Sequence, residues 1–292
     1  MAKGSIKDSD LQNTKKWGDA KYIEDDIIIV DDISNAPIPH EAMRMNFIIL
    51  ALCTDGHATY TLDTEEKTIH RNDVLIILDR HVVSNFCGSK DLKGLCIMLS
   101  VRFFFETIRN VSDVSSLLLF SRYHPIVNFS EQEADTFRNY FYLLKAKAAD
   151  SSNMFRRNVV STLTLAMFYD LSNVIQRVLA TGGERQSSSE IIFTRFIKLL
   201  EQNYKHERRV SWYADQLCIT AKYLSETIKN VSHRTPNEWL DNYVTVEMRV
   251  LLRNSSKSIK EIAEELHFAN QSFLGKYFKE HVGMSPSEYR KG

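Results

Sequence analysis

Residues 211–225 read S-W-Y-A-D-Q-L-C-I-T-A-K-Y-L-S, and residues 259–273 read I-K-E-I-A-E-E-L-H-F-A-N-Q-S-F. The two stretches are copies of one pattern, and an internal repeat defines the structural unit before any single motif does. At an offset of 49 residues the matched pairs are Ala214 with Ala263 and Leu217 with Leu266. At an offset of 50 they are Thr220 with Asn270, Leu224 with Leu274, Ile228 with Phe278, Lys229 with Lys279, Pro236 with Pro286 and Trp239 with Tyr289. The change in offset places one additional residue in the turn of the second copy, where a repeat tolerates an insertion.

Each copy has the pattern of a helix-turn-helix motif, in which a tight turn joins two short helices. The predicted helices are residues 211–217 and 221–231 in the first copy, and residues 259–266 and 271–281 in the second. They are expected to begin at Ser211, Thr220, Ser258 and Asn270, whose side-chain oxygens can accept hydrogen bonds from helix N–H groups. The small Ala214 and Ala263 allow the two helices of each motif to cross closely. Two copies favour DNA binding more strongly than one, because single helix-turn-helix pairs also occur in proteins that never bind DNA.

The end of the chain adds a third signal. Residues 276–279 read K-Y-F-K, and the closing pattern G-x-S-P-x-x-Y-R is formed by Gly283, Ser285, Pro286, Tyr289 and Arg290. Together with the two copies, these residues resemble the DNA-binding domain of the AraC/XylS family of bacterial transcription regulators. The resemblance is strong over about 100 residues and weak over the first 180. It implies a sequence-specific transcription regulator in which one long helix, here Asn237–Arg253, joins the two motifs.

Two positions depart from the family pattern. The family often has glycine in the second turn, where this chain has His267, and the residue of the first copy that matches Gly283 is His233. We expect both histidines to adopt left-handed or turn conformations, which histidine tolerates better than β-branched residues do.

The second helix of each motif is predicted to enter a major groove of DNA. The positions assigned to the protein core are Tyr223, Leu224, Thr227 and Ile228 in the first copy, and Phe273, Leu274, Tyr277 and Phe278 in the second. The outward positions that remain, matched to the family pattern, give Lys222, Ser225 and Glu226 as base-contacting residues, with Gln271, Ser272 and Lys276 in the second copy. The residues expected to contact phosphates are Ser211, Thr220, Lys229, Ser258, Asn270 and Lys279.

Two alternatives on these helices stay open. Glu226 is suited to accept a hydrogen bond from cytosine, but it is equally suited to a surface ion pair with Lys222 or Lys229. Gly275 lies in the middle of a helix, where its missing side chain either permits close approach to DNA or relieves crowding.

The charge of the chain constrains how it binds DNA. There are 37 Lys and Arg residues and 37 Asp and Glu residues, so the formal net charge is zero. Residues 190–292 carry a net charge of +3 and residues 1–189 a net charge of −3. Because phosphate contacts depend on basic side chains, so small an excess predicts modest non-specific affinity and reliance on base contacts and DNA shape.

The first half of the chain has a different pattern. Short β-branched or aromatic runs predict strands over residues 27–30, 46–53, 58–62, 74–78 and 95–101, with the last of these closing a small sandwich or barrel. Helices are expected over residues 102–110, 112–121, 131–149, 153–179 and 191–204. Ser130 with Glu133 has the pattern of a capping box. The expected fold class is therefore α+β.

The strand-rich half weakly resembles the cupin-like sensing domain that many regulators of this family carry. This resemblance implies a small-molecule effector, and Tyr60 is the candidate effector-binding residue, although core packing is the alternative. The expected domains are a cupin-like sensing and dimerisation domain over 1–179, a Gly/Ser-rich linker over 180–189 and a DNA-binding domain over 190–292. The helix over 153–179 is apolar on more than one side, so it is either buried within its own domain or also packed against a second copy in a homodimer.

A metal-dependent cupin enzyme with a helical appendage is the alternative function. Its expected ligands are histidines, but His40, His57, His70 and His81 are dispersed without an H-x-H pair. No catalytic motif is present, so we expect no enzyme, no cofactor and no metal. The four cysteines are scattered, as free thiols in a reducing compartment are, and the polar N-terminus does not resemble a signal peptide, so we expect a cytoplasmic protein. The apolar run 47–53 is far shorter than a membrane-spanning helix. The expected partners are promoter or operator DNA, an unidentified effector, a second copy of the chain and RNA polymerase.

Overall fold

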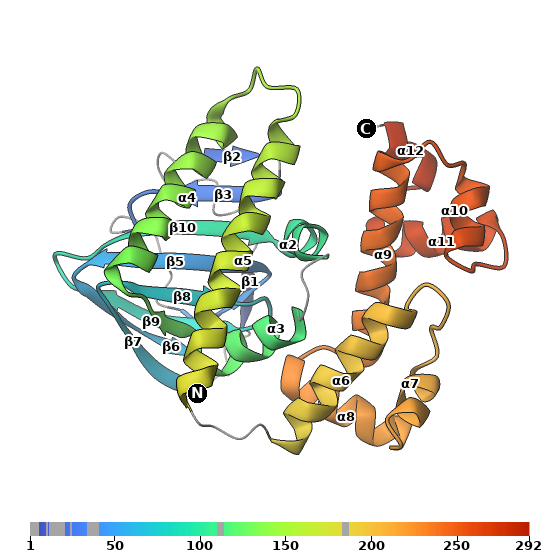
Figure 1. Cartoon of the computed structure of the whole chain (residues 1–292), viewed down its shortest axis with the longest axis horizontal. Helices are drawn as coiled ribbons and strands as arrows, with labels where there is room; N and C mark the ends of the chain where they lie inside the picture. The colour runs from blue at the N-terminus through green and yellow to red at the C-terminus, as the bar shows by residue number, and fades with distance from the viewer. Residues whose placement is uncertain are drawn as a thin grey trace. The chain divides into compact units, whose positions relative to one another are not determined.

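The structure is a computed structural model, and it describes residues 6–9, 11, 21–23, 25–33, 41–109, 114–182 and 187–291. The chain divides into two compact units, Met1–Glu184 and Arg185–Gly292 (Figure 1). The N-terminal unit combines sheets with helices and the C-terminal unit is helical, so the α+β fold class is confirmed.

Two sheets form the N-terminal unit. One has five strands in the order β1-β4-β9-β6-β7, and the other has six in the order β11-β8-β5-β10-β3-β2. Their bounds are β1 Lys7–Ser9, β2 Lys21–Ile23, β3 Ile27–Val30, β4 Met43–Met45, β5 Phe47–Asp55, β6 His57–Leu62, β7 Glu65–His70, β8 Asp73–Ile77, β9 Val82–Gly88, β10 Lys93–Ser100 and β11 Ile126–Asn128.

The core of this unit lies between the two sheets. Successive side chains of a strand point to opposite faces of its sheet, so every second residue points into this core. The core residues include Cys53, Cys96 and Met98 from the six-stranded sheet and Ala58 and Tyr60 from the five-stranded sheet. The opposite face of the six-stranded sheet is covered by helices, of which α4 and α5 lie across the strands in Figure 1. Because both faces of this sheet are covered, every residue of β3 and β8 is buried rather than every second one, and all of them except Asp73 are apolar.

Several expectations for the strands need correction. Residues 95–101 do not form the last strand, because Val101 begins a helix and β11 follows. The strands β7 and β9 were not expected. In β7 only Ile69 is buried, and β9 contains Asn85 with a positive φ of 53°, so neither shows an apolar run.

The helices of the N-terminal unit are α2 Val101–Ile108, α3 Val114–Tyr123, α4 Glu131–Ala149 and α5 Arg156–Gly182. Helix α4 has the bounds expected for it. Helix α5 ends beyond residue 179, and α6 begins at Ser188 with Ser187 as its N-cap, so both ends of the expected linker 180–189 are helical. Residues 183–186 lie outside the described residues.

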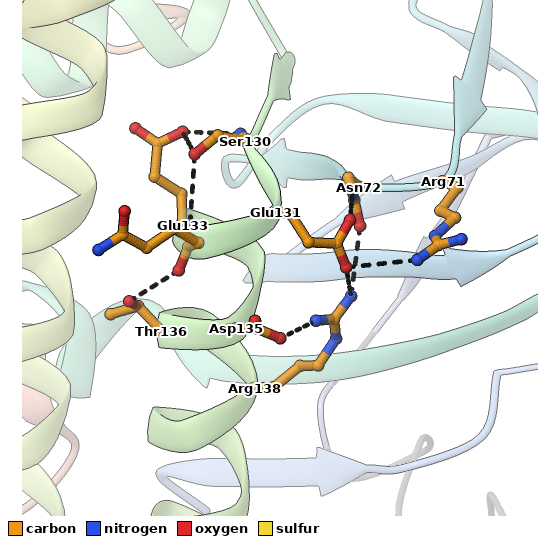
Figure 2. A network of polar contacts seen from close by, with 9 residues as sticks. Arg71, Asn72, Ser130, Glu131, Glu133, Asp135, Thr136 and Arg138 are labelled. Carbon is orange, nitrogen blue, oxygen red and sulfur yellow. Dashed lines mark hydrogen bonds and ion pairs between the residues drawn. The ribbon is translucent and has the colours of Figure 1, made fainter.

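A network of polar contacts attaches the start of α4 to the turn between β7 and β8 (Figure 2). Ser130 forms the expected capping box with Glu133. The Glu131 carboxylate accepts a hydrogen bond of 2.8 Å from Asn72 and forms an ion pair of 3.3 Å with Arg71. The hydrogen bond from Asn72 is the main reason that the pKa of Glu131 lies below its usual value. Asn72 adopts a left-handed φ of 67° in the turn, and its side-chain amide joins that turn to α4 through Glu131.

A buried carboxylate joins two further helices to the sheet. Asp26 is fully buried and accepts hydrogen bonds from Arg102 of α2 and Arg157 of α5. Arg157 also binds Glu106 at 2.7 Å. Because a buried charge is tolerated only when it is paired, this cluster fixes α2 and α5 against the end of the sheet.

The C-terminal unit contains α6 Ser188–Asn203, α7 Val210–Gln216, α8 Ala221–Ser232, α9 Pro236–Asn254, α10 Ile259–Glu265, α11 Gln271–Val282 and α12 Pro286–Lys291. Helices α7 and α8 form the first copy of the repeat, α10 and α11 form the second, and α9 joins them. No helix in the described part of the chain combines the length and the apolar character that crossing a membrane requires.

Candidate nucleic-acid interface

The two helix-turn-helix motifs close their turns with the same backbone hydrogen bond. In the first motif Ile219 N–H donates to the Ala214 carbonyl at 3.0 Å, and in the second Phe268 N–H donates to the Ala263 carbonyl at 2.8 Å. Both alanines are buried, so no side chain separates the crossing helices. The repeat in the sequence is therefore a repeat in the structure.

Three of the four expected caps are present. Thr220 accepts from Tyr223 N–H at 3.1 Å, Ser258 forms a capping box with Glu261, and Asn270 accepts from both Ser272 and Phe273 N–H groups. Ser211 is not a cap, because α7 begins one residue earlier at Val210 behind Arg209 and has no side-chain cap. The caps already satisfy some of the helix N–H groups that a phosphate would otherwise bind.

Non-glycine residues occupy left-handed backbone conformations at the ends of these helices. His267 has a φ of 52° and His233 a φ of 54°, which confirms the expectation for both histidines. Cys218 was missed, although it matches His267 at the offset of 49, and its φ is 56°. Left-handed conformations strain L-residues but not glycine.

Replacing Cys218 with glycine is therefore expected to raise the free energy of unfolding of the C-terminal unit by about 0.5–1 kcal/mol. Cys218 is exposed, so its side chain contributes little packing. Denaturant unfolding of the full chain measures the effect, and Cys218→Ala is the matched control because alanine keeps the strain. A glycine variant no more stable than the alanine variant would contradict the prediction.

The second helix of each motif buries one side and exposes the other. The buried residues are Leu224, Thr227, Ile228 and Val231 in α8, and Leu274 and Phe278 in α11. On these two helices the predicted DNA-contacting residues that are exposed are Lys222, Glu226, Lys229, Gln271, Ser272, Lys276 and Lys279, and the predicted phosphate contacts before or outside them, Ser211, Thr220, Ser258 and Asn270, are exposed as well. Ser225 is half-buried, and its hydroxyl donates to the Ala221 carbonyl at 2.8 Å.

The structure adds one observation on the alternatives at each of two positions. Among the described residues, neither Lys222 nor Lys229 forms an ion pair with Glu226, so the carboxylate faces solvent. A Cβ atom built on Gly275 meets nothing within 4 Å, so relief of crowding does not explain this glycine.

Two residues assigned to the core are exposed instead. Tyr223 is 46% exposed and Phe273 is 60% exposed. At 3.6 residues per turn each aromatic lies about a quarter to a third of a turn from the middle of the buried stripe, so it flanks that stripe and does not belong to it. Tyr277 was also assigned to the core and is half-buried, since its hydroxyl donates to Asp241 of α9 at 2.6 Å. Burial and this hydrogen bond raise the pKa of Tyr277.

Helix α9 is one residue longer at each end than expected, and it packs against both motifs. Thr235 and Glu238 form a capping box at its start, and Trp239 contacts Phe193 of α6 edge-on at 5.9 Å. Further along, Val244, Met248 and Leu252 share a buried cluster with Leu274 and Phe278 of the second motif. The helix therefore belongs to both hydrophobic cores.

A second contact joins the segment before α7 to the turn of the second motif. The Arg208 guanidinium lies 4.1 Å from the centre of the Phe268 ring and donates to the Leu266 carbonyl. The rings of His206 and His267 meet at 4.2 Å. Because cation–π and hydrogen-bond contacts both cross this joint, the two motifs are held in one arrangement.

The closing pattern of the chain is structural. Tyr289 of α12 packs edge-on against Phe278 at 5.3 Å, and Arg290 donates to the Lys257 carbonyl at 2.7 Å. Pro286 opens α12, where proline is favoured at a first helical position. These residues close the second motif over its core.

Tyr60 belongs to the other unit, in β6, and is 1% exposed within the core between the sheets. Its hydroxyl has no hydrogen-bond partner among the described residues. Burial, together with the charge of Asp73, raises the pKa of Tyr60. An unpartnered buried hydroxyl is unusual and calls for an explanation.

The dispersed histidines do not gather in the described structure. His57 and His70 lie across β6 and β7 with ring centres 6.1 Å apart, and His81 binds the Asp63 carboxylate at 2.9 Å. His40 lies outside the described residues. Within the described ranges, no three His, Cys, Asp or Glu side chains are placed to hold one metal ion together.

Known proteins match the C-terminal unit. Residues 213–292 match the family model of a helix-turn-helix domain. The activator RhaS of Escherichia fergusonii is 29% identical over 128 residues, which cover 43% of this chain and 45% of that protein. The Msm operon regulatory protein of Streptococcus mutans is 27% identical over 108 residues, which cover 37% of this chain and 39% of that protein. The C-terminal unit is therefore a helix-turn-helix domain, and its sequence is similar to those of these two regulators.

The match does not extend over whole proteins. The alignment spans less than half the length of either relative, so it concerns this helix-turn-helix domain alone. Among solved structures, ToxT from Vibrio cholerae with a bound unsaturated fatty acid is 11% identical, and the alignment covers 91% of this chain and 93% of ToxT at a TM-score of 0.35. At that TM-score the likeness supports no conclusion about this chain.

Proposed function

We propose that this chain is a sequence-specific DNA-binding transcription regulator whose activity is controlled by a small molecule bound in the N-terminal unit. The observation that carries the proposal is the pair of helix-turn-helix motifs that present equivalent polar helix faces and share helix α9. Helix α9 has 19 residues and, at 1.5 Å per residue, is about 28 Å long. Successive major grooves on one face of B-DNA are about 34 Å apart, so a helix of this length suits two adjacent grooves.

The exposed side chains on the two faces suit base recognition. Lysine donates to guanine, so Lys222 and Lys276 are base-contacting candidates, and the amide of Gln271 suits adenine. The solvent-facing Glu226 carboxylate suits the amino group of cytosine. Ser225 is the weaker candidate, because its hydroxyl proton is already donated within α8. Lys229 and Lys279 are the proposed phosphate contacts on these helices. The cap residues Thr220, Ser258 and Asn270 are proposed to contact phosphates as well.

The N-terminal unit is the proposed sensing domain. Its two sheets, antiparallel except for the parallel pair β1–β4, enclose an apolar interior in the manner of a cupin-like barrel, and the Tyr60 hydroxyl is an unpartnered polar atom within that interior. An apolar molecule with one hydrogen-bonding group, placed against Tyr60, would satisfy this hydroxyl. Such a ligand would shift the population of DNA-competent arrangements if it bound one of them more tightly.

Replacing Tyr60 with phenylalanine is expected to raise the free energy of unfolding of the ligand-free N-terminal unit by about 1–2 kcal/mol, because it removes an unsatisfied buried hydroxyl and keeps the ring. Urea unfolding of the full chain measures the effect. Tyr140→Phe is the matched control, since its hydroxyl donates to Asp170 at 2.7 Å and its loss is not expected to stabilise. A destabilised Tyr60→Phe variant would show that the hydroxyl is satisfied.

The proposed homodimer forms through helices α4 and α5. Several apolar residues of α5, among them Val160, Met167 and Phe168, are buried within the unit, so they do not by themselves indicate a partner. The large apolar residues that stay exposed on α4, on α5 and between them are Tyr142, Leu143, Tyr169, Met154 and Phe155. A group of exposed apolar side chains on adjacent helices supports a protein interface there.

Selection of bound fragments from a random DNA pool tests the proposed function. The full chain is expected to enrich one sequence family, because base contacts rather than bulk charge supply its specificity. Equal retention of all sequences would reduce the chain to a non-specific binder. No DNA retention, together with stoichiometric metal on elemental analysis, would favour the metal-dependent enzyme instead.

A further inference from the structure

Tyr223 and Phe273 hold the same position in the two motifs. They are 50 residues apart in the chain, which is the offset that relates α8 to α11, and both are exposed. Each is the third residue of its helix. Leaving an aromatic ring in water forgoes the free energy that burial would provide, and here this occurs twice at equivalent places. A chance exposure of one ring is common, but a duplicated one indicates that both rings serve the surface.

The two rings are fixed in place by the caps of their helices. The Tyr223 N–H donates to Thr220 and the Phe273 N–H donates to Asn270, so the backbone at each aromatic is held from the preceding turn. Three residues further along the helix, on the same face, lie Glu226 and Lys276. Side chains three apart on a helix are neighbours, so each ring lies beside a proposed base-contacting residue.

The surroundings identify what covers these rings. Lys222 and Lys276 are exposed near them, and Gly275, on the other side of the exposed face of α11 from Phe273, leaves that part of the helix without a side chain, so the surface admits a close anionic partner. The apolar feature that DNA offers in its major groove is the 5-methyl group of thymine, which aromatic and other apolar side chains contact. The rings therefore fit thymine better than they fit a polar base edge.

We propose that Tyr223 and Phe273 are specificity-determining residues that each pack against the 5-methyl group of a thymine. The target site then carries one such thymine in each of two elements that face successive major grooves. The proposal rests on the proposed function, because it specifies what the same two helices recognise.

The experiment compares thymine with deoxyuridine, which lacks only the 5-methyl group. Each thymine of the selected site is replaced singly by deoxyuridine, and the affinity of the full chain is measured by fluorescence anisotropy. One replacement in each element is expected to weaken binding by about fourfold, the equivalent of one buried methyl group.

Phe273→Ala is expected to bind the original site more weakly and to lose its discrimination between thymine and deoxyuridine in one element only. Tyr223→Ala is expected to do the same in the other element, and Tyr223→Phe to keep the discrimination.

Met284→Ala is the matched control, since Met284 is 43% exposed on the same unit but lies after α11. It is expected to discriminate as the unaltered chain does. Equal affinity for thymine and deoxyuridine at every position would overturn the inference while leaving the proposed function standing. A Phe273→Ala variant weakened equally on both DNAs would also overturn it, because the ring would then contact the sugar or phosphate. If the unaltered chain selects no site at all, the proposed function fails, and the inference fails with it.

Discussion

Replacing Phe278 with alanine is expected to lower the free energy of unfolding of the C-terminal unit by about 3–5 kcal/mol. Phe278 is fully buried among α9, α11 and α12, and its ring meets that of Tyr289 at 5.3 Å. The substitution leaves a cavity at the point where the second motif joins α9. Affinity for the selected DNA site is expected to fall as well, because α11 loses the packing that holds its exposed face in position.

Phe273→Ala supplies the matched comparison for stability. It removes the same side chain from the same helix, but Phe273 is 60% exposed, so its loss is expected to change the free energy of unfolding by no more than about 0.5 kcal/mol. Denaturant unfolding of the full chain, followed by circular dichroism, measures both variants. Equal losses for the two would contradict the placement of the helix and with it the orientation of the proposed DNA-binding face.

Replacing Lys276 with alanine is expected to weaken binding to the selected site by about 5- to 150-fold, the range for one lost base contact. The loss is expected to be sequence-dependent, so that the variant no longer distinguishes the base that Lys276 reads. Ser225→Ala is expected to act in the same direction with a smaller effect, since its hydroxyl is already donated to Ala221.

The control for charge is Lys198→Ala, which removes one cation from an exposed position of α6 outside both motifs. Its effect on affinity is expected to be small and equal for all sequences. Affinities measured by anisotropy against the selected site and single-base variants separate the two lysines. If Lys276→Ala lowered affinity by the same factor on every sequence, Lys276 would be a phosphate contact instead.

Much of the C-terminal unit could be predicted from the sequence, because local and global signals agree there. The caps Thr220, Ser258 and Asn270 mark helix starts, and the bounds of α9 and of the helices in the two motifs differ from the expected ones by only a residue, whereas α6 begins three residues earlier than expected. The exposure of Tyr223 and Phe273 could not be predicted from helical periodicity. Both flank the buried stripe, and whether a flanking ring is covered depends on where the neighbouring helix ends.

The N-terminal unit was harder to predict for a physical reason. Strand β7 has one buried residue, Ile69, so it does not show the apolar alternation by which a half-buried strand is recognised. The contacts that set Asp26 between Arg102 and Arg157 join residues 76 and 131 positions apart, which no local pattern reveals. The sequence is compatible with two roles for Tyr60, effector binding and core packing. The burial of its hydroxyl without a partner is the observation that the structure adds.

The most direct test of the central claim is the spacing between the two elements in the DNA sequences that the full chain selects. Because α9 packs into both motifs and Arg208 joins the segment before α7 to the second turn, the two recognition helices are held at one separation. We expect two elements whose centres lie about 10 base pairs apart, one helical turn, with no variation in spacing among the selected sequences. A single element, or two elements at variable spacing, would contradict it.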